Sequence, residues 1–324
     1  MIQLKKPKSS LLYALLILTL GVSGCKNQTK TSQDKKDTLT EVEQTDSIQE
    51  LPLPQVPSML TDAQAQMDYI LTHYWDKINF KDTTTHYTEG VLEQHWVNYI
   101  DRIATFEGDS YPKRIEEFMS KLNQGDKKNF QFYTKLADRY LYHPASPLRN
   151  DQLYRPFCVG MLDSPHLTAE EKERVQFKLE LIDRNNVGQK AENFYFKTQD
   201  GKTYQLYNIK NEFTLLFFNN PGCSMCAQVI EVMKQSETLT FLEHKKRLQV
   251  VAVCPDGDTS DWREHIKDFP THWLNGYDPN LYLFDNNLYD LRAIPSLYLL
   301  DKNHKVILKD ADISEVIAKI EEML

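Results

Sequence analysis

Two different periods of apolar residues follow one another along the chain. Over residues 58–186 apolar positions recur every three or four residues, which is the spacing of one face of a helix. Six such stretches are separated by polar or proline-containing breaks. Two of them open with a threonine followed three residues later by Gln or Glu, the pattern of a capping box, at Thr61/Gln64 and Thr168/Glu171. The pattern predicts an all-α domain over 58–186.

Beyond residue 186 the period shortens to two or the apolar run becomes continuous. Residues 193–207 alternate around Asp200-Gly201, a pair typical of a β-hairpin. Residues 213–219 and 248–254 are continuous apolar runs, as expected of strands in a sheet that is covered on both faces. Two further stretches predict short strands, at 296–300 and 305–308. Three others predict helices, at 223–236, 261–269 and 313–324. This alternation predicts an α/β domain with a mixed sheet over 187–324.

The first 57 residues show neither pattern. Three lysines precede a short apolar run that has the length of a signal-peptide core rather than of a membrane span. The run ends in Val22-Ser23-Gly24 before Cys25, which resembles the bacterial lipobox. We expect a lipoprotein signal peptide over 1–24 and lipidation at Cys25; ordinary secretion, with Cys25 as a spare thiol, is the alternative. Residues 25–57 are polar and end in a proline-rich stretch, which predicts a disordered tether.

The net charge of the chain and its expected compartment limit the classes of function. The chain of 324 residues has a formal net charge of -8 and no strongly basic stretch after the signal peptide, so we expect no nucleic-acid partner. Export would place the protein where disulfides form and persist. Four cysteines then remain besides Cys25: Cys158, Cys223, Cys226 and Cys254.

Cys223 and Cys226 stand where an apolar strand pattern gives way to a helical one. The first cysteine would lie at a helix N-terminus, where the dipole and free N–H groups stabilise a thiolate. The second would lie one turn later on the same face. One thiol can then attack a substrate disulfide while the other resolves the mixed disulfide. We expect Cys223 and Cys226 to form a catalytic redox pair.

Two other uses of the pair remain open. A zinc site usually needs a second pair of ligands, whereas Cys158 and Cys254 are solitary and the nine histidines are scattered, so we expect no metal. A purely structural disulfide is the other use, although so small a loop gains little chain entropy.

With these residues in view, residues 188–324 resemble the thioredoxin fold, and within it the membrane-tethered TlpA/ResA-like thiol–disulfide oxidoreductases. The Asp200-Gly201 hairpin precedes the core strand, and Cys223-Ser224-Met225-Cys226 opens the helix. Ala293-Ile294-Pro295 precedes a strand, and Leu299-Leu300-Asp301 resembles the closing hairpin. The helical part resembles an uncharacterised domain that precedes thioredoxin modules in Gram-negative lipoproteins, a likeness that implies no activity.

The resemblance implies a role for each site residue. Cys223 would be the nucleophile, Cys226 the resolving thiol, and the two would form the redox disulfide. Pro295 would be cis and face the cysteines, and Ile294 would offer backbone groups to an extended substrate. Such relatives are mostly reductants, so we expect reduction of disulfides in envelope proteins. No NAD or flavin site is evident in the sequence, so we expect no cofactor and a membrane protein that donates the electrons. We therefore expect a lipid-anchored protein of the cell envelope that faces the periplasm or the cell surface.

The chain also departs from thioredoxin. Gly222 stands in place of the usual Trp, Ser224-Met225 replaces Gly-Pro, and Phe217 replaces a buried Asp that assists proton transfer. Glu231 is a candidate substitute for that acid, although an exposed helix-face acid is the interpretation that we favour. These departures leave the redox potential and the direction open, so oxidase or isomerase action stays an alternative.

Other interpretations concern the remaining cysteines and the activity. Cys254 could be a third redox thiol at the same sheet edge as Cys223, but a buried apolar cysteine is the expectation we favour, as for Cys158. A thiol peroxidase would need Thr and Pro before its cysteine, where Asn220 and Leu216 stand. A non-enzymatic binding module, whose helical domain holds a partner, stays open.

Overall fold

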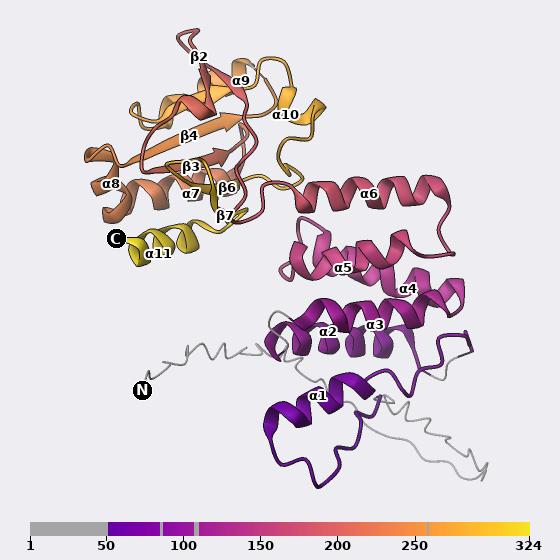
Figure 1. The fold of residues 1–324 in the computed structure, drawn as a ribbon. Helices are drawn as coiled ribbons and strands as arrows, with labels where there is room; N and C mark the ends of the chain where they lie inside the picture. The colour runs from indigo at the N-terminus through magenta and orange to yellow at the C-terminus, as the bar shows by residue number, and fades with distance from the viewer. Residues whose placement is uncertain (1–50, 85–86, 107–109, 258) are drawn as a thin grey trace, which may run out of the picture. The chain divides into compact units, whose positions relative to one another are not determined.

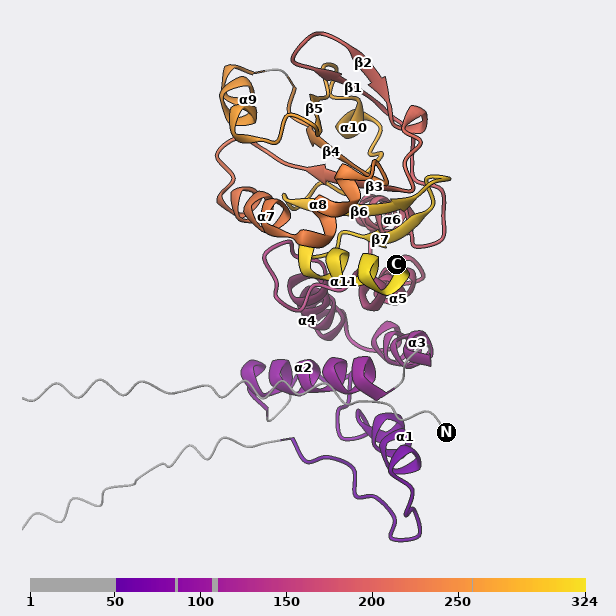
Figure 2. The same ribbon diagram turned by 90° about the vertical axis from the view of Figure 1, so that its left-hand side faces the viewer.

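The computed structural model describes residues 51–324 apart from 85–86, 107–109 and 258 (Figures 1 and 2). The predicted signal peptide 1–24 and Cys25 lie outside the described residues. No helix within the described part is both long and apolar enough to cross a membrane. Residues 51–57 form irregular backbone, and the side chain of Leu51 is buried, which a freely solvated tether would not show.

The first half of the described chain is helical, as its period predicts. Each helix corresponds to one of the six stretches of apolar residues. The helices are α1 (Ala63–His73), α2 (Glu89–Phe106), α3 (Tyr111–Asn123), α4 (Lys127–Ala137), α5 (Asp151–Leu162) and α6 (Ala169–Asp183), and a π-helical turn, η2 (Asp138–Tyr142), follows α4.

The two predicted capping boxes have different outcomes. Thr168 and Glu171 form the box at α6, each side chain bonded to the backbone of the other. At α1 the prediction is wrong, because the N-cap is Asp62, whose carboxylate accepts from the N–H of Ala65 at 2.8 Å. A negative charge interacts favourably with the helix N-terminus, which a neutral Thr61 cannot do.

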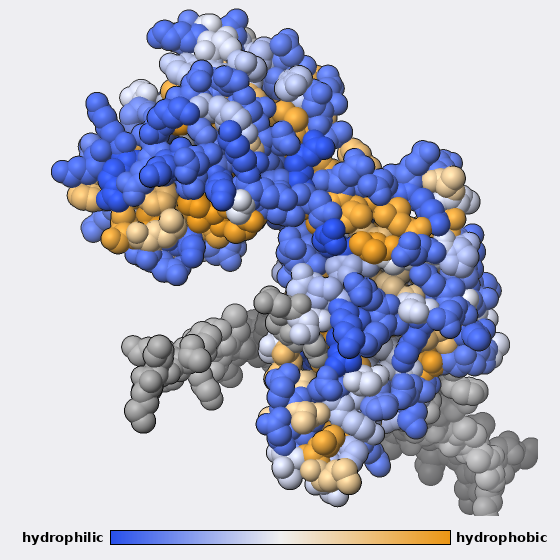
Figure 3. All heavy atoms as spheres, in the orientation of Figure 1, coloured by the Kyte–Doolittle hydropathy of each residue, from blue (hydrophilic) through white to orange (hydrophobic). Residues whose placement is uncertain are grey.

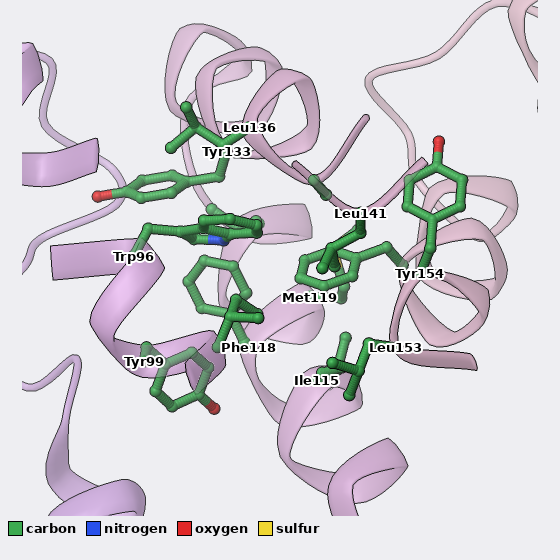
Figure 4. Packing of buried hydrophobic residues seen from close by; sticks show 14 of the residues in the cluster. Trp96, Tyr99, Ile115, Phe118, Met119, Tyr133, Leu136, Leu141, Leu153 and Tyr154 are labelled. Atoms are coloured by element: carbon green, nitrogen blue, oxygen red, sulfur yellow. The ribbon is translucent and has the colours of Figure 1, made fainter. Parts of the chain in front are cut away.

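An aromatic core holds these helices together (Figure 4). Trp96, Phe118 and Tyr133 are at most 1% exposed and come from three different helices. Helices α3 and α5 approach closely at Gly160, where an added Cβ would lie 2.6 Å from that of Met119. The buried aromatic residues of this region therefore serve as packing, and each of them buries a large apolar area.

The second half of the described chain is built on one sheet of seven strands in the order β2-β1-β5-β4-β3-β6-β7. Its central strands carry the continuous apolar runs of the sequence. The strands are β1 (Tyr195–Thr198), β2 (Thr203–Gln205), β3 (Phe213–Phe218), β4 (Leu248–Cys254), β5 (Leu274–Tyr277), β6 (Ser296–Asp301) and β7 (Val306–Lys309). Strand β3 is parallel to β4 and antiparallel to β6, so the sheet is mixed, as predicted.

The alternation of side chains along β3 separates two apolar layers. Leu215 and Phe217 join the cluster that also contains residues of α7 (Ser224–Gln235), α8 (Glu237–His244) and α11 (Ile313–Met323). Leu216 and Phe218 join the cluster on the other face, which also contains apolar residues of the segment 191–209. Figure 2 shows these three helices together on one side of the sheet. Figure 3 shows apolar surface over this part of the molecule. Each of the three helices also has an exposed apolar side chain: Val232 in α7, Phe241 in α8 and Met323 in α11.

The remaining helical elements are short. They are η3 (Leu206–Asn208), α9 (Ser260–His265), η4 (Ile266–Asp268) and α10 (Tyr282–Asp285). Helix α8, strand β5 and α10 were not expected. Strand β5 has the sequence Leu-Asn-Gly-Tyr, which carries no strand period, and it forms by pairing with β4 and β1. Partners from elsewhere in the chain thus override a weak local preference.

Candidate functional site

The two cysteines and the proline meet at one edge of the sheet. Phe218, the last residue of β3, pairs with Val253 of the parallel strand β4 and with Ser296 of the antiparallel strand β6. The carboxyl ends of β3 and β4 and the amino end of β6 therefore share this edge. The loop to Cys223 and the segment ending at Pro295 are consequently brought together from opposite ends of the domain.

Cys223 and Cys226 are joined in a disulfide, with their Cα atoms 5.2 Å apart. Cys223 is the N-cap of α7, and its Sγ accepts a hydrogen bond from the backbone N–H of Cys226 at 3.1 Å. Cys223 is partly exposed, whereas Cys226 is fully buried. Solvent and partners can thus reach the first sulfur but not the second. Met225, between the two, leaves 55% of its surface exposed.

The segment before β6 faces the first cysteine. The Ile294–Pro295 peptide bond is cis. The Sγ of Cys223 lies 3.9 Å from the carbonyl oxygen of Ile294. Both Ile294 and Pro295 are partly exposed, so the segment beside Cys223 is accessible in part. A chain that binds in extended form along this segment would pass over Cys223.

The surroundings of Cys226 are apolar. Phe217, at the position of thioredoxin's buried acid, is fully buried in the same cluster as Cys226. Glu231 does not replace that acid: its side chain is 60% exposed and pairs with Lys234 at 2.9 Å. Five residues along a helix correspond to a rotation of roughly 140°, so Glu231 and Cys226 face different sides of α7. The exposed-acid interpretation agrees with this geometry.

Among the described residues, the two cysteines outside the disulfide are buried. Cys254 is 1% exposed and packs with Trp262, and burial raises the pKa of its thiol to about 11. Its Sγ lies 4.0 Å from Oδ1 of Asn220, so it does stand near the loop that leads to Cys223. Cys158 lies in the helical core, where burial raises its pKa to about 12. Neither thiol is ionised at neutral pH, which fits the packing role favoured for both.

Across residues 51–324, outside the short undescribed gaps, no three His, Cys, Asp or Glu side chains are grouped as metal ligands would be. Cys223 and Cys226 also share a disulfide, and cysteines bind metal as thiolates.

A set of charged residues beside the proline segment was not anticipated from the sequence. Arg292 pairs with Asp290 at 3.0 Å and with Asp151 of α5, and its guanidinium lies 3.6 Å from the ring centroid of Tyr142. Arg292 and Asp151 are 141 residues apart in the chain, and no spacing rule connects them. Only the folded structure brings these side chains together.

Comparison with protein families matches both halves of the chain. Residues 24–185 match a family described as a domain of unknown function (DUF5106), and residues 211–306 match one described as thioredoxin-like. The first match spans half of the chain, and it includes most of the expected helical domain 58–186 while starting earlier in the chain. A search of curated proteins found no match.

Solved structures give a likeness over most of the chain. A thioredoxin-like protein from Bacteroides caccae is 37% identical, and its crystal structure superposes with a TM-score of 0.80 over 86% of this chain and 100% of that one. The C-terminal domain of an uncharacterised protein from Bacteroides fragilis is 45% identical over 42% of this chain and 98% of that one, with a TM-score of 0.42. The extent and identity of the first of these matches decide the relationship: the chain belongs to the thioredoxin-like proteins that carry a helical DUF5106 domain before the thioredoxin-like domain.

Proposed function

We propose that the protein is a thiol–disulfide oxidoreductase of the cell envelope that reduces protein disulfides through Cys223 and Cys226. One observation supports this above others. The partly exposed Cys223 at a helix N-terminus is bonded to the buried Cys226, and its sulfur lies 3.9 Å from the carbonyl oxygen of Ile294. A structural bridge needs neither the access nor the carbonyl beside it.

The reduced form would act in two steps. The Cys223 thiolate, stabilised by the Cys226 N–H and the helix N-terminus, attacks one sulfur of the substrate disulfide. A mixed disulfide forms, and the other substrate sulfur leaves as a thiolate. Cys226 then loses its proton and attacks Sγ of Cys223, which restores the Cys223–Cys226 bond and releases the second substrate thiolate. Two electrons pass to the substrate, and the two departing thiolates take up protons.

Ile294 and Pro295 would position the substrate during the attack. The carbonyl oxygen of Ile294 can accept a hydrogen bond from a backbone N–H of an extended chain. Such a chain would carry its cysteine toward Cys223. The expected substrates are disulfide-containing envelope proteins, because this mode of binding uses backbone groups.

The same proposal includes three further points. The protein reduces its substrates, a membrane protein donates the electrons, and a lipid on Cys25 anchors the chain. The TlpA/ResA-like resemblance supports reduction, which requires a dithiol donor at the membrane to restore the two thiols after each cycle.

The lipobox at Val22-Ser23-Gly24-Cys25 supports a lipid anchor on Cys25. A Cys25→Ala variant expressed in a bacterial host should leave the membrane fraction; continued membrane association would count against the anchor.

Three variants of the soluble part test the activity. Cys223→Ser should abolish exchange with a disulfide substrate, because serine is a poor nucleophile toward sulfur. Cys226→Ser should instead trap the mixed disulfide. Cys254→Ser, at a buried thiol whose pKa is raised to about 11, is the matched control and should exchange at the wild-type rate.

The reduction potential of the Cys223–Cys226 pair decides whether the protein reduces or oxidises its substrates. It is measured by equilibration with dithiothreitol or glutathione buffers. A reduction potential near or below about -250 mV would agree with a reductant such as thioredoxin. A value of about -120 to -180 mV would instead favour the oxidase or isomerase alternative. If Cys223→Ser kept the exchange activity, or if the pair did not titrate, the binding-module interpretation would replace this proposal.

A further inference from the structure

We propose that the helical domain positions the Ile294–Pro295 segment for substrate capture, acting through the residues on either side of that segment. This inference rests on the proposed function and deepens it. Its basis is a pair of crossed ionic contacts: Arg149 binds Asp310, and Asp151 binds Arg292. Two helical-domain residues of opposite charge thus meet two complementary residues of the thioredoxin-like domain.

The first contact holds the chain before the proline. Arg292 stands two residues before Ile294, and only 14% of its side chain is exposed. It binds Asp151 at the start of α5, it binds Asp290 at 3.0 Å, and it stacks on the ring of Tyr142 at 3.6 Å. Tyr142 and Asp151 both come from the helical domain. A planar guanidinium held by two carboxylates and an aromatic face has little freedom to move.

The second contact holds the chain after the proline. Ser296 follows Pro295 directly and is 1% exposed. Its hydroxyl donates to Oδ1 of Asp310 at 2.9 Å, and Oδ2 of Asp310 pairs with Arg149. The helical domain therefore reaches Ser296 through a single intermediate carboxylate, of which 15% is exposed. The cis-proline segment is held from both sides by residues 149 and 151.

This arrangement matters for one class of substrate. A small disulfide needs only the accessible sulfur of Cys223. An extended polypeptide also needs the carbonyl of Ile294 in register with that sulfur, since backbone pairing aligns its cysteine. Loosening the segment should therefore impair reaction with a peptide disulfide and leave the small disulfide unaffected. Arg292 and Asp151 are positioning residues in this account, since neither contacts the reacting sulfurs.

The test uses the full soluble chain with Asp151→Asn and, independently, Arg149→Gln. The substrates are an unstructured peptide with one disulfide and bis(2-hydroxyethyl) disulfide. We expect kcat/KM for the peptide to fall about 10-fold or more in each variant, on the scale of a displaced positioning contact. The rate with the small disulfide and the reduction potential should stay at wild-type values.

The matched control is Arg155→Gln. It breaks an equally well-formed ion pair, that of Arg155 with Asp183 at 2.6 Å, which lies wholly inside the helical domain. It should change neither rate. If either positioning variant fails to fold by circular dichroism, the other still decides the question, since the two contacts reach different sides of the proline.

Two outcomes would overturn the inference: wild-type kcat/KM with both substrates, or an equal loss with both, which would mean general damage. Failure of the proposed function looks different, because the wild-type protein itself would then react with neither substrate.

Discussion

His95 shows how a single side chain can make the stability of this protein depend on pH. It lies in the aromatic core of the helical domain, 5% exposed, with its ring stacked on Tyr74 at 4.2 Å between centroids. Its Nε2 is 3.4 Å from the carbonyl oxygen of Tyr74, and the Tyr74 hydroxyl donates to the carbonyl of His95. Burial is the main cause that lowers the pKa of His95 to about 4. The ring is therefore neutral at pH 7.

The free energy of unfolding should fall when the pH drops below about 6.5. Between pH 6.5 and 4 the unfolded chain binds a proton at this histidine and the folded protein does not, so acid favours unfolding. The loss should reach about 3 kcal/mol at pH 4, from roughly 1.4 kcal/mol per unit of pKa difference. Urea titrations of the wild type and of His95→Gln at pH 4 to 7 measure this loss. The carboxylates contribute alike to both proteins, so the difference between their pH profiles isolates the histidine. Parallel pH profiles of the two proteins would contradict the prediction.

At the scale of the elements, one glycine sets how closely two helices pack. Gly160 of α5 faces Met119 of α3, and a Cβ at Gly160 would lie 2.6 Å from the Met119 Cβ. Gly90, in the first turn of α2, is exposed, and a Cβ there would meet nothing within 4 Å. The same substitution is therefore predicted to have opposite effects at two helical positions.

Gly160→Ala should lower the free energy of unfolding by about 1–3 kcal/mol, because the extra methyl group pushes α5 away from α3. Gly90→Ala should raise it by up to about 1 kcal/mol, since alanine loses less backbone entropy in a helix. Thermal and urea unfolding of both variants provide the measurement. Equal effects of the two changes would show that α3 and α5 are not in close contact.

At the scale of the whole described molecule, a strand of the sheet completes the end of a helix. Lys309 of β7 donates from Nζ to the carbonyl oxygens of Ile182 and Arg184 at 2.7 Å each, at the C-terminus of α6. These carbonyls have no partner within the helix, and a cation is favourable at this end. Burial lowers the pKa of Lys309, and neighbouring aspartates act in the opposite direction. Folding of the sheet and of α6 should therefore be coupled.

Lys309→Met should lower the free energy of unfolding by about 2–3 kcal/mol, because it leaves partly buried carbonyls without a charged donor. Lys319→Met is the control: Lys319 pairs with an exposed Glu322, and its loss should change stability by less than about 1 kcal/mol. Urea unfolding followed by fluorescence and by far-ultraviolet circular dichroism would show both effects. A Lys309 variant as stable as the control would refute the coupling.

Some residues of the candidate site could be predicted from the sequence and others could not, for a physical reason. Cys223 at the start of a helix follows from the change of period at that point, and the structure places it as the N-cap of α7. Cys254 near the same edge follows from two parallel apolar strands. Arg292 and Asp151 could not be found in this way, because their contact spans 141 residues. Side chains that meet across domains leave no local period.

The sequence by itself determined the elements whose stability is local. The six helices follow from a period of 3.6 and the Asp200-Gly201 hairpin from a period of 2, and the buried strands β3 and β4 follow from continuous apolar runs. All three patterns depend on residues a few positions apart. Only the tertiary structure decided the rest: the pairing that makes β5 a strand, the carbonyl of Ile294 beside Cys223, and the ionic contacts around Pro295. Each of these depends on groups far apart in the chain, whose interaction exists only once the core has folded.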